Sequence, residues 1–190
     1  MREYSAHQKS SDLPKRIDAE ANRRTLIHTA RRVFAQKGAD ISLAEIAKEA
    51  KVSRPTLYRN FKDKGALVVA VFEYNIDLLE RYAQKLEEDQ QACFKILEMI
   101  AYQQARFQAL IVFFPGDETP LIQRVLDIMA GPIERAKAQN LLRMDFNLES
   151  DLLLIIRMLA FSIGTNNGDQ WKKESQRALK LLLEGLRTNA

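Results

Sequence analysis

Residues 41–67 read ISLAEIAKEAKVSRPTLYRNFKDKGAL, and this stretch carries the signals for two short helices joined by a tight turn. Ser42 and Glu45 have the spacing of a capping box, in which the serine hydroxyl accepts a first-turn amide and the glutamate reaches back to the cap. Ser53 is a second N-cap residue, and Pro55 follows at the second helical position, where a missing N–H costs no intrahelical hydrogen bond. The pattern predicts a helix-turn-helix.

The second of these helices, expected over residues 54–60, separates a buried face from an exposed one. Leu57 and Phe61 lie four residues apart, so both point toward the core. The remaining faces can meet the major groove of DNA, where arginine pairs with guanine, a threonine methyl touches thymine, and tyrosine or lysine holds phosphate oxygens. The candidate DNA-contacting residues of the motif and its flanks are Ser42, Ser53, Arg54, Thr56, Tyr58, Arg59, Lys62 and Lys64.

Charge is distributed unevenly along the 190 residues. Residues 1–64 contain 15 basic and 8 acidic side chains, whereas residues 65–190 contain 14 basic and 17 acidic ones. Basic residues on their own often do no more than keep helices in solution. Beside a helix-turn-helix, however, local positive charge favours double-stranded DNA as the partner of the first third of the chain.

Helical periodicity continues on both sides of the motif. Residues 1–18 lack it and predict a mobile arm, whereas residues 19–37 predict an amphipathic helix that Gly38 ends through a left-handed backbone. Asp63 is an N-cap residue for a long helix over residues 64–88. The basic residues near the arm that could reach phosphates or the minor groove are Lys15, Arg16, Arg23 and Arg24. A disordered tail is an equal alternative for the first two.

The second half of the chain also reads as helices. One or two are expected over residues 90–114, and a turn at residues 115–117 precedes a helical stretch that Gly131 and Pro132 should kink or split. Two final helices are expected at residues 151–163 and 170–187. With roughly nine helices and no convincing strand, the sequence predicts an all-α fold.

The stretch at residues 41–67 closely resembles the DNA-binding signature of the TetR family. In that family a capped helix with a pair of small residues precedes a tight turn ending in Val-Ser, then Thr-Leu-Tyr and a nearby aromatic residue. Those positions are here Ala47, Ala50, Val52, Ser53, Thr56, Leu57, Tyr58 and Phe61. The resemblance implies that Tyr58 and Lys64 anchor phosphates and that Arg54, Thr56 and Arg59 read bases. Lys51 departs from the pattern, because it stands where the family commonly has glycine and would need a strained backbone.

The resemblance also implies the domain organisation. A three-helix DNA-binding domain at residues 20–80, with its helix-turn-helix core at residues 42–61, is joined by a long helix to an approximately six-helix domain at residues 81–190. That second domain would bind an effector and form a homodimer, because two recognition helices must lie about 34 Å apart to read a palindromic operator. Residues 151–164 are apolar nearly all round, and a second subunit or the domain's own core would bury them.

The candidate pocket residues suit an apolar or aromatic small molecule. They are Met99, Tyr102, Phe107, Phe114, Met129 and Phe161. Ordinary core packing is the alternative for each of them. Arg157, in the middle of the most apolar helix, is expected to pair across the dimer, to lie exposed at a rim or to face an acidic ligand.

Composition argues against other classes of protein. His7, His28 and Cys93 form no catalytic or metal-binding cluster in the sequence, so we expect neither enzyme activity nor a cofactor. No apolar stretch reaches about 18 residues, which together with the lone cysteine favours the cytoplasm. The sequence predicts a transcriptional regulator, a repressor that a small molecule releases from its operator. The alternatives are a DNA-binding dimer without an effector and a helical protein-interaction module.

Overall fold

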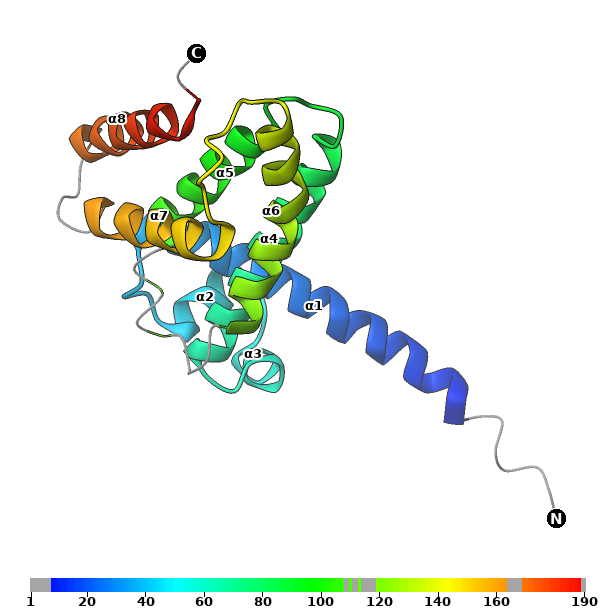
Figure 1. Cartoon of the computed structure of the whole chain (residues 1–190). Coiled ribbons are helices and arrows are strands. Elements are labelled where there is room, and N and C mark those ends of the chain that lie inside the picture. Colours follow the sequence, from blue (N-terminus) through cyan, green and yellow to red (C-terminus); the bar gives the residue numbers. More distant parts are fainter. Residues whose placement is uncertain (1–7, 108–109, 111–112, 114–118, 164–168, 189–190) are drawn as a thin grey trace. The chain divides into compact units, whose positions relative to one another are not determined.

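The computed structural model describes residues 8–107, 110, 113, 119–163 and 169–188. Side chains are placed within these ranges at residues 18–103, 106–107, 110, 113, 120–155, 158 and 176–188. The described chain is all-helical, as predicted (Figure 1). Its helices are α1 (Gln8–Lys37), α2 (Leu43–Glu49), α3 (Arg54–Asn60), α4 (Lys64–Lys85), α5 (Ala92–Phe107), α6 (Thr119–Ala138), α7 (Leu148–Ile163) and α8 (Asp169–Leu186).

The chain divides into two compact units, and the division falls inside α4. The first unit contains α1, α2, α3 and α4 as far as Val71, together with Phe113. The second contains the remainder of α4 from Phe72 and the helices α5 to α8. The sequence placed the boundary between its two domains at residue 80, further along the same helix.

The first unit is built on one apolar stripe of α1. The buried members of the stripe recur at helical spacing, which places them on one face: Leu26, Ala30, Val33 and Phe34. The short helices α2 and α3 pack onto α1 and onto each other, and they bury Ile46, Ala47, Leu57 and Phe61. Helices of seven residues are not stable on their own in water, so this packing is what holds α2 and α3 in place.

The start of α1 differs from the prediction. The helix begins at Gln8, so the expectation of an arm without regular structure is wrong for residues 8–18, while residues 1–7 lie outside the described chain. Starting a helix is unfavourable, but extending one gains a hydrogen bond for each residue that is fixed. The packed turns around Leu26 provide the nucleus, and the polar residues before them extend it without any apolar periodicity.

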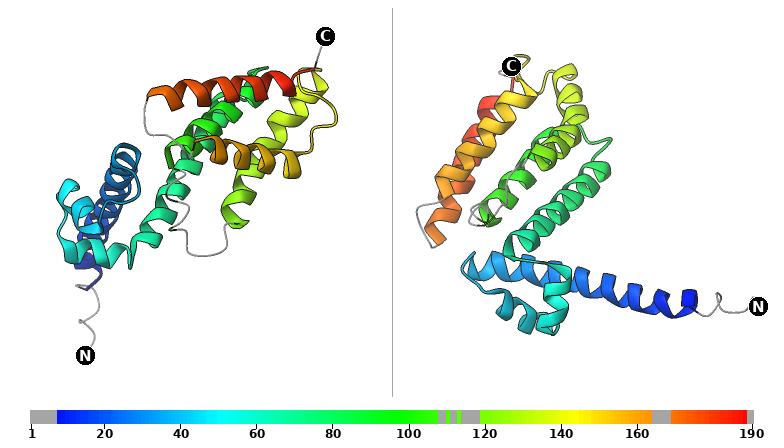
Figure 2. Two further views of the ribbon diagram at one scale, coloured as in Figure 1. Left: turned by 90° about the vertical axis from the view of Figure 1, so that its left-hand side faces the viewer. Right: turned by 90° about the horizontal axis from the view of Figure 1, so that it is seen from below.

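The second unit is organised around α5. This helix packs against α6, α7 and α8, and α7 also packs against α6 and α8 (Figure 2). The core between these helices includes Phe94, Leu97, Met129, Ile133, Leu142, Phe146 and Leu152. No helix in the described part of the chain combines the length and the apolarity needed to cross a membrane.

The helices of the second unit differ in part from those expected. Within residues 90–114 the structure describes one α-helix, α5, in line with the one or two expected, and the described chain has eight α-helices where roughly nine were expected. α6 continues through Pro132, so of the two outcomes expected at Gly131 and Pro132, a kink or a split, the split is wrong. Pro132 and its neighbour Ile133 are both buried, and this packing offsets the backbone hydrogen bond that proline cannot make.

Lys51 ends α2 in a conformation that usually belongs to glycine. Its φ is 55°, in the left-handed region. The Lys51 N–H donates to the Lys48 carbonyl at 3.1 Å, and the Val52 N–H donates to the Ala47 carbonyl at 3.0 Å. These two bonds form a Schellman motif with Lys51 at its left-handed position. The strain that the sequence indicated at this residue is therefore confirmed.

Replacing Lys51 by glycine is expected to stabilise the protein. A left-handed conformation costs a non-glycine residue about 1–2 kcal/mol, and the greater freedom of glycine in the unfolded chain cancels about 0.5–1 kcal/mol of the gain. K51G should therefore raise the free energy of unfolding by about 0.5–1 kcal/mol, measured by urea denaturation. K48G is the matched control, because it puts glycine inside α2 and should destabilise. A loss of stability in both variants would contradict the left-handed conformation of Lys51.

Candidate nucleic-acid interface

The packing of α3 fixes which of its faces is exposed. Ser53 is the N-cap, and its hydroxyl oxygen accepts the Thr56 backbone N–H at 3.3 Å. At the other end the Phe61 N–H donates to the Leu57 carbonyl at 2.8 Å. The side chains of Leu57 and Phe61 are buried, as their spacing predicted. The opposite face of the helix therefore lies on the surface of the first unit.

That exposed face of α3 is basic and carries one large aromatic ring. Arg54, Tyr58 and Arg59 are all exposed, and 54% of the Tyr58 surface is accessible to solvent. Lys62, just beyond the helix, is exposed as well, and its ammonium lies 3.9 Å from the Asp63 carboxylate. Guanidinium, phenol and ammonium groups are the donors that contact bases and phosphates in protein–DNA complexes.

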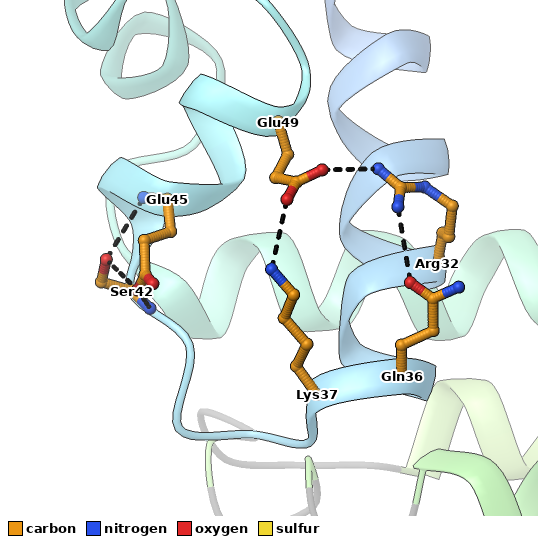
Figure 3. A network of polar contacts seen from close by, with 6 residues as sticks. All are labelled: Arg32, Gln36, Lys37, Ser42, Glu45 and Glu49. Atoms are coloured by element: carbon orange, nitrogen blue, oxygen red, sulfur yellow. Dashed lines mark hydrogen bonds and ion pairs between the residues drawn. The ribbon is translucent and has the colours of Figure 1, made fainter.

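The serines among the candidate residues act as helix caps. The Ser42 hydroxyl accepts the Glu45 N–H at 3.2 Å and the Ser42 N–H donates to the Glu45 carboxylate at 3.0 Å, which completes the predicted capping box (Figure 3). The hydroxyls of Ser53 and Thr56 lie 2.8 Å apart. Asp63 caps α4 in the same way, by accepting a first-turn amide at 2.7 Å. These groups fix where the helices of the motif begin.

A carboxylate at the end of α2 ties that helix to the end of α1. Glu49 forms ion pairs with Arg32 at 3.0 Å and with Lys37 at 3.2 Å (Figure 3). The hydrogen bond from Arg32 is the main cause that lowers the pKa of Glu49 below its ordinary value of 4.5, and the bond from Lys37 adds to it. The same three residues link the end of α2 to the end of α1, and α3 follows directly after α2.

This ion-pair cluster predicts a pH dependence of stability. Because the folded state lowers the pKa of Glu49, its contribution is present above pH 4.5 and disappears as the pH falls through the lower folded value. E49Q should therefore be less stable than the wild type at neutral pH, and the difference should shrink on acidification. Thermal denaturation of both proteins across this pH range measures the effect. A difference that stays constant with pH would contradict the role of the charge.

Lys64 points back into the first unit. Its ammonium donates to the Ala39 carbonyl and lies 4.1 Å from the centroid of the Phe113 ring. Burial lowers the pKa of Lys64, and the nearby Asp40 acts in the opposite direction. The side chain thus connects the first turn of α4 to the segment between α1 and α2. Tyr58 and Lys64, the two predicted phosphate anchors, therefore differ: the Tyr58 ring is exposed, whereas the Lys64 ammonium is bonded within the first unit.

Arg23 was not expected to contact α3, but it does. Its guanidinium Nη1 donates to the Asn60 carbonyl at 3.3 Å, and its Cζ atom lies 4.6 Å from the centroid of the Phe61 ring. The sequence contains a signal for the direction of the Arg23 side chain, although not for its partner. Arg23 precedes Leu26 by three residues and Ala30 by seven, so it lies on the same stripe of α1 as the buried core.

The candidate pocket residues that the structure describes differ in burial. Met129 is buried in the core of the second unit, and Met99 packs against the same core. Phe107 is also buried, whereas 53% of the Tyr102 surface is accessible to solvent. Outside the described residues lie Phe114 and the side chains of Lys15, Arg16, Arg157 and Phe161.

The helix-turn-helix matches known regulators in sequence. The family model for bacterial regulatory proteins of the tetR family matches residues 26–71. An HTH-type transcriptional regulator of Staphylococcus aureus (strain USA300) is 31% identical over 85 residues, which cover 44% of this chain and 46% of that relative. The match therefore spans a little less than half the length of the curated relative.

Solved structures share the fold over most of the chain. A TetR transcriptional regulator from Streptomyces coelicolor aligns with a TM-score of 0.70 and 23% identity, covering 88% of this chain and 99% of the other. A gamma-butyrolactone receptor described as ArpA-like aligns with a TM-score of 0.53 and 20% identity, covering 89% of this chain and 98% of the other. At these identities the structural likeness establishes the fold. The helix-turn-helix thus matches the tetR family model over residues 26–71, and the chain around it shares its fold with TetR regulators.

Proposed function

We propose that this chain is a cytoplasmic transcriptional repressor that binds a palindromic operator as a homodimer and is released from it by a small molecule. One observation carries the proposal. The exposed face of α3 presents Arg54, Tyr58 and Arg59, while the opposite face is fixed to the core by Leu57 and Phe61. A short helix with a basic outer face, held rigidly in a helix-turn-helix, is suited to the major groove of DNA.

The proposed contacts divide by chemistry. Arg54 and Arg59 would read base edges together with Thr56, and Tyr58, Lys62 and Lys64 would hold the phosphate backbone. The net positive charge of residues 1–64 supports this division, because a polyanion is attracted to local charge. Ser42 and Ser53 would contribute by fixing where α2 and α3 begin, because each accepts a first-turn amide of its helix.

A homodimer is supported by apolar side chains on the surface of the last two helices. The exposed fractions of Leu154 on α7 and Leu181 on α8 are 54% and 51%, and Met158 lies four residues after Leu154 and is also exposed. Large apolar side chains gathered on neighbouring helices are typical of protein–protein contact surfaces. A second copy of the chain would cover them and would supply the second recognition helix that a palindrome requires.

Selection from a library of random duplexes, followed by fluorescence anisotropy on the enriched duplex, tests the DNA-binding role. The wild type should enrich a palindrome and should bind it more weakly as the salt concentration rises. Y58A should weaken binding. The matched control is Y102A, which removes an equally exposed tyrosine from α5 in the second unit and should leave binding unchanged. Enrichment of no sequence by the wild type would overturn the proposal.

The effector needs a separate experiment. The proposal draws on the fold shared with the gamma-butyrolactone receptor and on the aromatic and methionine side chains of the second unit. A thermal-shift screen with a gamma-butyrolactone and a set of planar aromatic compounds should find one that raises the melting temperature, because a ligand bound only to the folded state stabilises it. The same compound should release the enriched duplex. If every stabilising compound leaves the duplex bound, the dimer without an effector is the correct alternative.

A further inference from the structure

Arg23 holds the end of α3 in two ways at once. One guanidinium N–H donates to the carbonyl of Asn60, the last residue of α3, and the guanidinium carbon lies over the ring of Phe61, the residue that follows. The two groups are neighbours in sequence, so a single side chain from α1 fixes both the backbone and the side chain at the point where α3 ends. A guanidinium suits both tasks, because it is a planar donor that also stacks on aromatic rings.

The end of α3 needs such a partner. The last four carbonyls of a helix accept no hydrogen bond from an N–H of the same helix. In a helix of seven residues, these four are more than half of all the carbonyls. A positive charge near these carbonyls is also favourable, because the helix dipole is negative at its C-terminus. Ser53 caps the N-terminal end of α3, and Arg23 contacts the C-terminal end.

We propose that Arg23 is a positioning residue for DNA recognition, which acts by holding the C-terminal end of α3 against α1 and not by touching DNA. The inference rests on the proposed DNA-binding function of α3. It also reassigns a basic residue that the sequence would place among the phosphate contacts. If the guanidinium no longer contacts Asn60 and Phe61, α3 can tilt. Arg59, near the end of α3, is then no longer positioned to reach the base edges.

The neighbouring residue supplies a matched control. Arg24 is one position further along α1, and its Nε atom lies 3.2 Å from the Glu20 carboxylate in an exposed pair on the same helix. Exposed pairs of this kind contribute little to stability. R23A and R24A therefore remove the same side chain from adjacent positions, and only R23A removes a contact with α3.

Two measurements separate positioning from contact with DNA. The first is the affinity for the enriched duplex across a range of salt concentrations. R23A should bind about tenfold more weakly at each concentration, with an unchanged slope of log affinity against log salt. The second is hydrogen exchange at the Phe61 amide, which donates to the Leu57 carbonyl and should exchange about tenfold faster in R23A. R23K, which keeps the charge and loses the planar stack, should fall between R23A and the wild type. R24A should match the wild type in the exchange measurement.

Other results would overturn the inference. A salt slope that falls by about one unit in R23A identifies Arg23 as a direct phosphate contact. Equal exchange at the Phe61 amide in R23A and R24A means that Arg23 does not hold α3. If the wild type binds no duplex, the proposed function fails, while the exchange measurement still decides whether Arg23 holds the end of α3.

Discussion

F61A should lower the free energy of unfolding of the first unit by about 3–5 kcal/mol, which is the usual cost of removing a buried phenylalanine ring. Phe61 is among the largest fully buried side chains of the protein, and it anchors the end of α3. Its ring also carries the guanidinium of Arg23, so the substitution removes a second contact together with the first. Because a domain is stable by only about 5–15 kcal/mol, the change should bring the first unit close to unfolding.

Circular dichroism during urea denaturation measures this effect, and Y58A is its control. Tyr58 lies on the same helix, three residues before Phe61, but its ring is exposed. Its removal should change the free energy of unfolding by no more than about 0.5 kcal/mol. The two variants should thus differ sharply in stability, although each removes one aromatic ring. Equal losses in F61A and Y58A would mean that α3 does not separate a buried face from an exposed one.

The helix-turn-helix could be predicted from sequence because its determinants are local. Ser42, Ser53 and Asp63 each cap a helix through an atom within three residues, and the structure confirms all three caps. The spacing of Leu57 and Phe61 also specified the buried face of α3 without any knowledge of its partners. Local hydrogen bonds and helical periodicity depend only on residues that are close in sequence. They are kept in the folded protein when tertiary packing is consistent with them.

Contacts between distant residues could not be predicted in this way. Arg23 donates to a carbonyl that lies 37 residues away in the sequence, and Lys64 donates to one that lies 25 residues away. Every residue has a carbonyl, so such a partner leaves no mark on the sequence. For the same reason the sequence did not decide between a kink and a split of α6 at Pro132, because the packing that holds this helix comes from other helices. Basic residues are therefore the hardest to assign from sequence, since an internal contact and a DNA contact use the same side chain.

Leu154→Glu combined with Leu181→Glu should convert the proposed homodimer into a monomer and should lower the affinity for the enriched palindrome by about a hundredfold or more. A carboxylate placed in an apolar interface must lose its hydration without gaining a partner, which opposes association. A monomer binds one half of the palindrome at a time, and it loses the gain of about 10²–10⁴ that linked binding provides. Sedimentation velocity gives the oligomeric state, and anisotropy on the same duplex gives the affinity.

M144E is the matched control for this pair of substitutions. Met144 lies in the segment between α6 and α7, and 69% of its surface is accessible to solvent, so a glutamate there adds one of the two negative charges of the double variant to the second unit, outside the two helices. It should leave both the dimer and the affinity intact. Both leucines are themselves exposed, so the double variant should keep the helical circular dichroism of the wild type, and any loss of association then comes from the surface of α7 and α8. If the double variant still sediments as a dimer, the interface lies elsewhere, and the two recognition helices are paired through another surface of the chain.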